Sequence, residues 1–143
     1  MGSRTRSLAI MTALRRRQLD EEVARLTGLS GMRANNLLQQ EGNMDARARM
    51  GRVTELAVLP YLSSHAVALS RHMDVLRADQ AVIDREIEAQ KGRVEAAWRK
   101  GRVMDSLTEK ARAEMAEKGA AAQQALIDEL VLIGHARGRA LRA

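Results

Sequence analysis

The sequence predicts an all-α fold, a long antiparallel coiled-coil hairpin of two helices in a single domain over residues 1–143. Three observations support this prediction. The chain has no Phe, one Trp and one Tyr, so its apolar residues are mostly Ala, Leu, Val, Ile and Met, which suit a narrow interface between helices. Only one proline disallows continued helix, and no segment alternates apolar and polar residues as a strand would.

The first helix is predicted at about residues 5–41. Apolar residues three or four positions apart predict one packed face, made of Leu19, Val23, Leu26, Leu37 and Met44. Polar residues interrupt this face at Ser30, Arg33 and Gln40. Gly28 and Gly31 each cost roughly 1 kcal/mol relative to Ala inside a helix. The first helix is therefore predicted to be the more mobile arm.

The chain is predicted to reverse in a turn region at about residues 42–60. Residues 41–45 have the composition of a turn, and Gly51 and Pro60 follow them. The second helix is predicted at about residues 55–136, with a kink or an irregular start around Pro60.

The second helix carries the clearest pattern in the chain, a 3.5-residue repeat of apolar residues over more than seven heptads. Twelve of its sixteen predicted core positions are apolar, and the exceptions are Gln80, Gln90, Gly101 and Thr108. The sixteen positions are Leu62, Ala66, Leu69, Met73, Leu76, Gln80, Ile83, Ile87, Gln90, Val94, Ala97, Gly101, Met104, Thr108, Ala111 and Met115. The phase then slips by one residue, and Leu126, Leu130 and Ile133 are predicted to continue the packed face. Two glycines, at 134 and 138, predict a fraying end.

The net charge of +6 is concentrated at the two chain ends. Residues 1–20 carry +4, which includes Arg15, Arg16 and Arg17, and residues 135–143 carry +3, which includes Arg137 and Arg139. A hairpin is expected to bring both basic ends to one tip. Charge alone leaves nucleic-acid binding open, but the chain offers no aromatic platform for single strands, so an acidic protein partner fits at least as well.

The composition argues against an enzyme and against a cofactor. There is no cysteine and no glycine-rich phosphate loop between a strand and a helix. His65 and His72 are seven residues apart, about 10.5 Å along a helix, which is too far for one tetrahedral metal ion. No apolar run approaches the roughly 20 residues that span a bilayer, so no direct membrane insertion is expected.

Tyr61, His65, Ala68 and His72 follow one another at spacings of four, three and four residues, beside the predicted core. This line is either the amphipathic rim of the coiled coil or a recognition surface, because Tyr is enriched at the energetic centres of interfaces. The residues alone do not decide between the two interpretations.

Several segments of the second helix resemble the FliJ family, the coiled-coil stalk of the flagellar type III export ATPase. They are the start at Tyr61–His65, the run Val94–Lys100, the segment Leu107–Lys110 and the segment Leu126–Glu129. The basic segment Leu14–Asp20 is similar to the opening helix of that family. The resemblance covers nearly the whole chain.

The resemblance implies a cytoplasmic, non-catalytic protein at the periphery of the membrane export apparatus. Its partners would be the hexameric export ATPase, the cytoplasmic domain of the export gate and other export chaperones. The family's gate-binding line would correspond to Tyr61, His65, Ala68 and His72, with His65 in place of an apolar residue. The basic ends, with Arg15, Arg16, Arg17, Arg137 and Arg139, would face the ATPase ring. The family's first helix adds tyrosines, but residues 27–50 contain none, and Leu38 and Gln39 are the nearest remnants.

A stalk of this kind would be a monomer in solution. Two alternatives to the stalk remain. In a structural, dimerising coiled coil the second helix would pair with its own copy, and Gln80 and Gln90 would set the register. A basic nucleic-acid-binding coiled coil is the weaker alternative, and a strong loss of binding with salt would support it.

Overall fold

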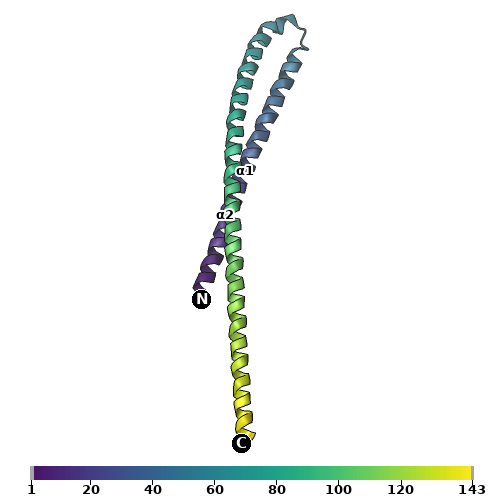
Figure 1. Ribbon diagram of the computed structural model, residues 1–143. Coiled ribbons are helices and arrows are strands. Elements are labelled where there is room, and N and C mark those ends of the chain that lie inside the picture. The colour runs from purple at the N-terminus through teal and green to yellow at the C-terminus, as the bar shows by residue number, and fades with distance from the viewer. Residues whose placement is uncertain (1, 143) are drawn as a thin grey trace. The chain divides into compact units, whose positions relative to one another are not determined.

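The computed structural model describes residues 2–142, which are helical except for one short connection. Helix α1 spans Gly2–Met50, the 3₁₀ helix η1 spans Leu56–Val58, and helix α2 spans Leu59–Arg142 (Figure 1). These residues contain no strand. The helices pack against each other, and the predicted all-α helical hairpin is confirmed.

Helix α1 continues past its predicted end at residue 41 and stops at Met50. The turn-like residues Gly42 and Asn43 are therefore helical, and the chain reverses only in the connection from 51 to 58. The physical reason is tertiary, because Asn43 is buried and its Nδ2 donates a hydrogen bond to the backbone carbonyl of Leu69 in α2 (2.9 Å). A packed asparagine here outweighs the local turn preference of the sequence.

Helix α2 begins at Leu59, four residues after the predicted start at 55, and ends at Arg142 instead of 136. Pro60 lies in its first turn, where a missing N–H leaves no intrahelical bond unmade. Gly134 and Gly138, predicted to mark a fraying end, are part of the helix.

The chain divides into two compact units, where the sequence predicted a single domain. Among the described residues, unit 1 contains 2–16 and 100–142, and unit 2 contains 17–99.

Unit 2 is an antiparallel pair of helices closed by the 51–58 connection. Its buried apolar side chains all come from α2: Met73, Leu76, Ile83 and Ile87. They are four of the predicted core positions, and each stabilises the fold by roughly 1.5–3 kcal/mol when fully buried. The predicted positions Leu62, Leu69, Val94 and Ala97 are half-buried in the same unit, whereas Ala66 is exposed.

The packed face of α1 in unit 2 differs from the predicted one. Val23, Leu37 and Met44 are exposed. The face that meets α2 instead runs through Leu19, Glu22, Leu26, Leu29, Asn36, Gln40 and Asn43. Both sets have heptad spacing and share Leu19, Leu26 and Gln40. The observed face is polar at its C-terminal end, so apolar spacing alone selected Val23, Leu37 and Met44 in place of Glu22, Asn36 and Asn43.

In unit 1, residues 2–16 of α1 pack antiparallel against α2. Met104 is the buried apolar side chain of this unit. The hydroxyls of Thr12 and Thr108 lie 3.1 Å apart, and the Thr5 hydroxyl donates to the Met115 sulfur (3.1 Å). Beyond Met115 the prediction is wrong, because Leu126, Leu130 and Ile133 are exposed and no part of α1 in unit 1 covers them (Figure 1).

Candidate protein-binding surfaces

The core of unit 2 contains a cluster of three amide side chains, Asn36, Gln40 and Gln80. The Gln40 Nε2 donates to the Asn36 Oδ1 (2.6 Å) and to the Gln80 Oε1 (2.7 Å). The Asn36 Nδ2 donates to the backbone carbonyl of Leu76 (3.0 Å). Asn36 and Gln40 are both buried. The cluster is therefore a satisfied polar network inside a coiled-coil core, where amides are known to fix the pairing of helices.

Asn43 differs from that cluster because one of its polar atoms has no partner. The side chain is 4% exposed, and its Nδ2 bonds the Leu69 carbonyl. Its Oδ1 is buried and makes no hydrogen bond. A buried acceptor left in this state costs about 1–3 kcal/mol.

Two further polar contacts join the helices of unit 2. The Gln90 Nε2 donates to the backbone carbonyl of Glu22 (2.9 Å) and to its carboxylate. The Arg33 Nε lies 2.7 Å from the Asp84 Oδ1. Gln80 and Gln90 thus both bond side chains or backbone of α1. The two positions that would set the register of a dimer are therefore occupied within the chain.

The four residues of the predicted recognition line are all exposed on α2 of unit 2. We call Tyr61, His65, Ala68 and His72 the Tyr–His line. Each precedes a core position by one residue, and the Tyr61 side chain is 76% exposed. The structure places the line on one accessible face of the helix, as its spacing predicts.

The Tyr–His line continues into a groove that the sequence did not reveal. Spacings of three, four and three residues extend it through Val75, Asp79 and Val82. The groove lies between the two helices of unit 2 and is lined by Met32, Asn35, Asn36, Gln39, Leu76, Asp79, Val82, Ile83 and Glu86. The repeat on α2 could have identified Val75 and Val82. The α1 residues Met32 and Gln39 had no comparable signal, because the packed face of α1 was assigned incorrectly.

The basic residues of the two chain ends do not meet. In unit 1 the Arg16 Nη2 lies 3.9 Å from the Asp105 Oδ1. Arg137 lies 32 residues further along α2, about 48 Å at roughly 1.5 Å per residue. Arg137 and Arg139 are exposed. The expected single basic tip is therefore wrong, because within this unit the segment of α2 is much longer than the segment of α1.

Arg15 and Arg17 have different surroundings from Arg16. Arg15 is half-buried on the packed face of α1 in unit 1. Arg17 belongs to unit 2, where its Nε lies 3.4 Å from the Glu21 carboxylate, one turn along the same helix. The run of three arginines thus presents Arg16 and Arg17 to solvent and turns Arg15 toward α2.

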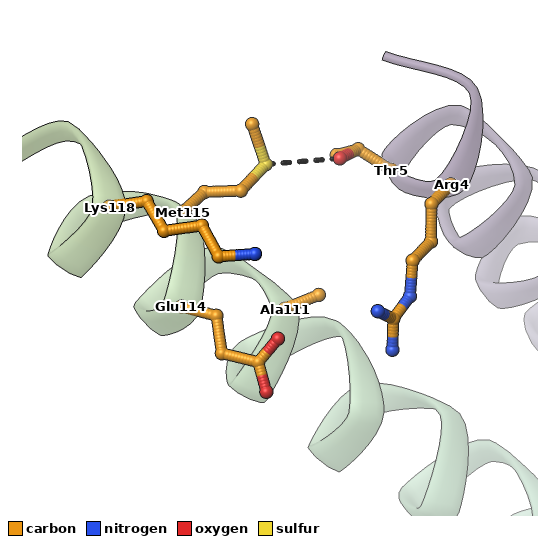
Figure 2. Close-up of a pocket in the computed structure, with 6 residues that line it drawn as sticks. All are labelled: Arg4, Thr5, Ala111, Glu114, Met115 and Lys118. Atoms are coloured by element: carbon orange, nitrogen blue, oxygen red, sulfur yellow. Dashed lines mark hydrogen bonds between the residues drawn. The ribbon is translucent and has the colours of Figure 1, made fainter. Parts of the chain in front are cut away.

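Unit 1 also contains a pocket lined by both signs of charge. Figure 2 shows the side chains of Arg4 from α1 and of Glu114 and Lys118 from α2 around the Thr5–Met115 contact. No side chain here pairs a nucleophile with a general base in the way that covalent catalysis requires.

Neither helix contains a stretch, within residues 2–142, that is long and apolar enough to cross a bilayer. In the same residues no group of three or more His, Asp or Glu side chains lies close enough to hold a metal ion. Comparison of the chain with protein-family models, with curated proteins and with solved structures finds no match. The exposed surfaces described above are therefore the basis for the functional proposal.

Proposed function

We propose that this chain is a non-catalytic stalk of a flagellar type III export apparatus, similar to the FliJ family. In this role it binds a hexameric export ATPase and the cytoplasmic domain of an export gate, with other export chaperones as further partners. It acts in the cytoplasm at the periphery of the membrane export apparatus. No cofactor and no nucleic acid take part.

The observation that carries the proposal is the exposed Tyr–His line beside the groove of unit 2. A tyrosine and two histidines on one helix face offer amphipathic side chains to a partner, and such residues supply much of the binding energy in interfaces. Val75 and Val82 extend this face with exposed apolar side chains. Since α1 already covers the core positions of α2 in unit 2, this face is open to another protein. We assign it to the export gate.

The exposed arginines are assigned to the ATPase. Arg16 and Arg17 form one group and Arg137 and Arg139 a second. Because Arg137 lies about 48 Å along α2 from Asp105, the ion-pair partner of Arg16, the two groups contact different parts of the ring. Each group therefore contributes to binding separately, and Arg15 contributes less because it is half-buried.

The test measures binding of the purified chain to an export ATPase and, separately, to a gate cytoplasmic domain. Replacing Tyr61 and His72 with Ala is expected to weaken gate binding by at least tenfold and to leave ATPase binding unchanged. Val67→Ala is the matched control, because Val67 is exposed on α2 but faces away from the Tyr–His line. Substitution of Arg137 and Arg139 is expected to show the reverse pattern. Absence of binding to both partners would overturn the proposal.

A further inference from the structure

The C-terminal part of α2 carries an uncovered apolar surface. In unit 1 the hydrogen bond from Thr5 of α1 reaches α2 at Met115, and every residue from 112 to 137 is exposed. Leu126, Leu130 and Ile133 are 57%, 59% and 43% exposed, and we call these three residues the C-terminal stripe. Their spacing of four and three residues places them on one face. A helix with such a face gains stability when the face is packed.

The charges beside the stripe are arranged about Ile133. Glu129 lies four residues before it and Arg137 four residues after it. If a second copy packs antiparallel with its Ile133 against this Ile133, each Glu129 faces an Arg137. A parallel pair would place like charges opposite each other, which is unfavourable. The charge pattern therefore selects an antiparallel pair of identical helices.

The sizes of the side chains fit the same register. Because residues whose numbers are symmetric about 133 lie opposite each other, Leu130 faces Ala136 and Leu126 faces Ala140. A large residue opposite a small one lets two helices approach closely and interdigitate. In this register Arg137 lies on the stripe face, so that its apolar stem would cover the stripe while its guanidinium would reach the carboxylate of Glu129 in the second copy.

We propose that residues 124–142 of α2 form an antiparallel pair with the same segment of a second copy, centred on Ile133. The pair has few apolar layers and two ion pairs open to solvent, so it is weak, in the micromolar range or above. The chain is then a monomer when dilute and a dimer when concentrated. This dimer leaves the helix pair of unit 2 intact, in contrast to one that pairs α2 along its whole length.

Sedimentation of the purified chain over a range of concentrations tests this inference. The mass is expected to rise from 15.8 kDa toward twice that value. Glu129→Arg is expected to weaken the dimer by about tenfold, because it places two arginines opposite each other. The double substitution Glu129→Arg with Arg137→Glu restores the attraction and is expected to restore the dimer. A monomer at every concentration, or a double variant that stays as weak as Glu129→Arg, would overturn the proposal.

Cross-linking tests the register, since the natural sequence contains no cysteine. Ile133→Cys is expected to give a disulfide-linked dimer on mild oxidation, because residue 133 faces its own copy at a distance a disulfide can bridge. Asp128→Cys is the control, as position 128 is exposed but lies on the other side of α2. Equal cross-linking of the two variants would refute the stated interface. Neither experiment contains an ATPase or a gate protein, so their outcome is independent of the proposed export function.

Discussion

Replacing Gln40 with Leu tests whether the amide cluster of unit 2 stabilises the fold as a connected network. Gln40 is buried and donates to both Asn36 and Gln80. After the substitution the Asn36 Oδ1 remains buried without a donor, which costs about 2 kcal/mol. Gln80 is only half-buried and can reach water, so its loss is about 1 kcal/mol. The new Leu contributes about 2 kcal/mol of burial, and the net result is a loss of about 1 kcal/mol.

The triple substitution of Asn36, Gln40 and Gln80 by Leu is expected to have the opposite sign. It removes three hydrogen bonds, each with a net value of about 1 kcal/mol, and leaves no amide of the cluster unpaired. Two buried leucines and one half-buried leucine contribute about 5 kcal/mol. The triple variant should therefore be about 2 kcal/mol more stable than the natural chain.

Urea unfolding followed by far-ultraviolet circular dichroism measures both variants against the natural chain. A connected network requires the single and the triple variant to change stability in opposite directions. If Gln40→Leu stabilises the chain in proportion to its apolar area, the cluster is hydrated and the network described here does not contribute to stability.

Three further substitutions in unit 2 have defined outcomes. Gly42→Ala is expected to stabilise the chain by about 1 kcal/mol, because Gly42 lies inside α1 with open space at its Cβ position; a loss of stability in thermal unfolding would indicate a turn at this position. Asn43→Leu is expected to raise stability by about 2 kcal/mol in urea unfolding, since it removes the buried acceptor without a partner. A decrease would show that the Leu69 contact matters more. Arg33→Ala is expected to lower stability by about 0.5 kcal/mol at low salt, because both side chains of its ion pair are partly exposed. The difference should disappear at high salt, and an unchanged difference would contradict an electrostatic origin.

The packed face of α2 was predictable because only one phase of its sequence keeps apolar residues at heptad spacing. The buried residues Met73, Leu76, Ile83, Ile87 and Met104 all lie at predicted positions. Their pattern needs no knowledge of the partner helix, because the alternative faces of α2 are charged.

The packed face of α1 was not predictable in the same way. Its two candidate faces share Leu19, Leu26 and Gln40, and they differ in that one includes Leu37 and the other Asn36. The apolar residues that only the predicted face contains, Val23, Leu37 and Met44, are exposed, because the amides of the other face bond to backbone and side chains of α2. Such bonds depend on where α2 lies, and the spacing of residues along α1 does not indicate that position.

The candidate surfaces also differ in how far they were predictable: parts that depend on α2 alone were, and parts that depend on the packed face of α1 were not. Exposure of the Tyr–His line follows from its offset of one residue from the core of α2. The groove beside it needed Met32 and Gln39 to be placed on the correct side of α1. The separation of the arginine groups followed from the unequal lengths of the helices, since α1 has 49 residues and α2 has 84.

The polar core of unit 2 contributes specificity of pairing more than stability. Asn36 and Asn43 are seven residues apart and both donate to backbone carbonyls, so a shift of α1 by one heptad would put one of them where the other now lies. The pairing of Gln40 with Gln80 has no such equivalent. A shift by seven residues in either direction brings an arginine of α1 opposite Gln80 and leaves an amide of the core without its partner. Because a buried unpaired amide and a displaced cation are both unfavourable, the Gln40–Gln80 contact is what fixes the register of the two helices.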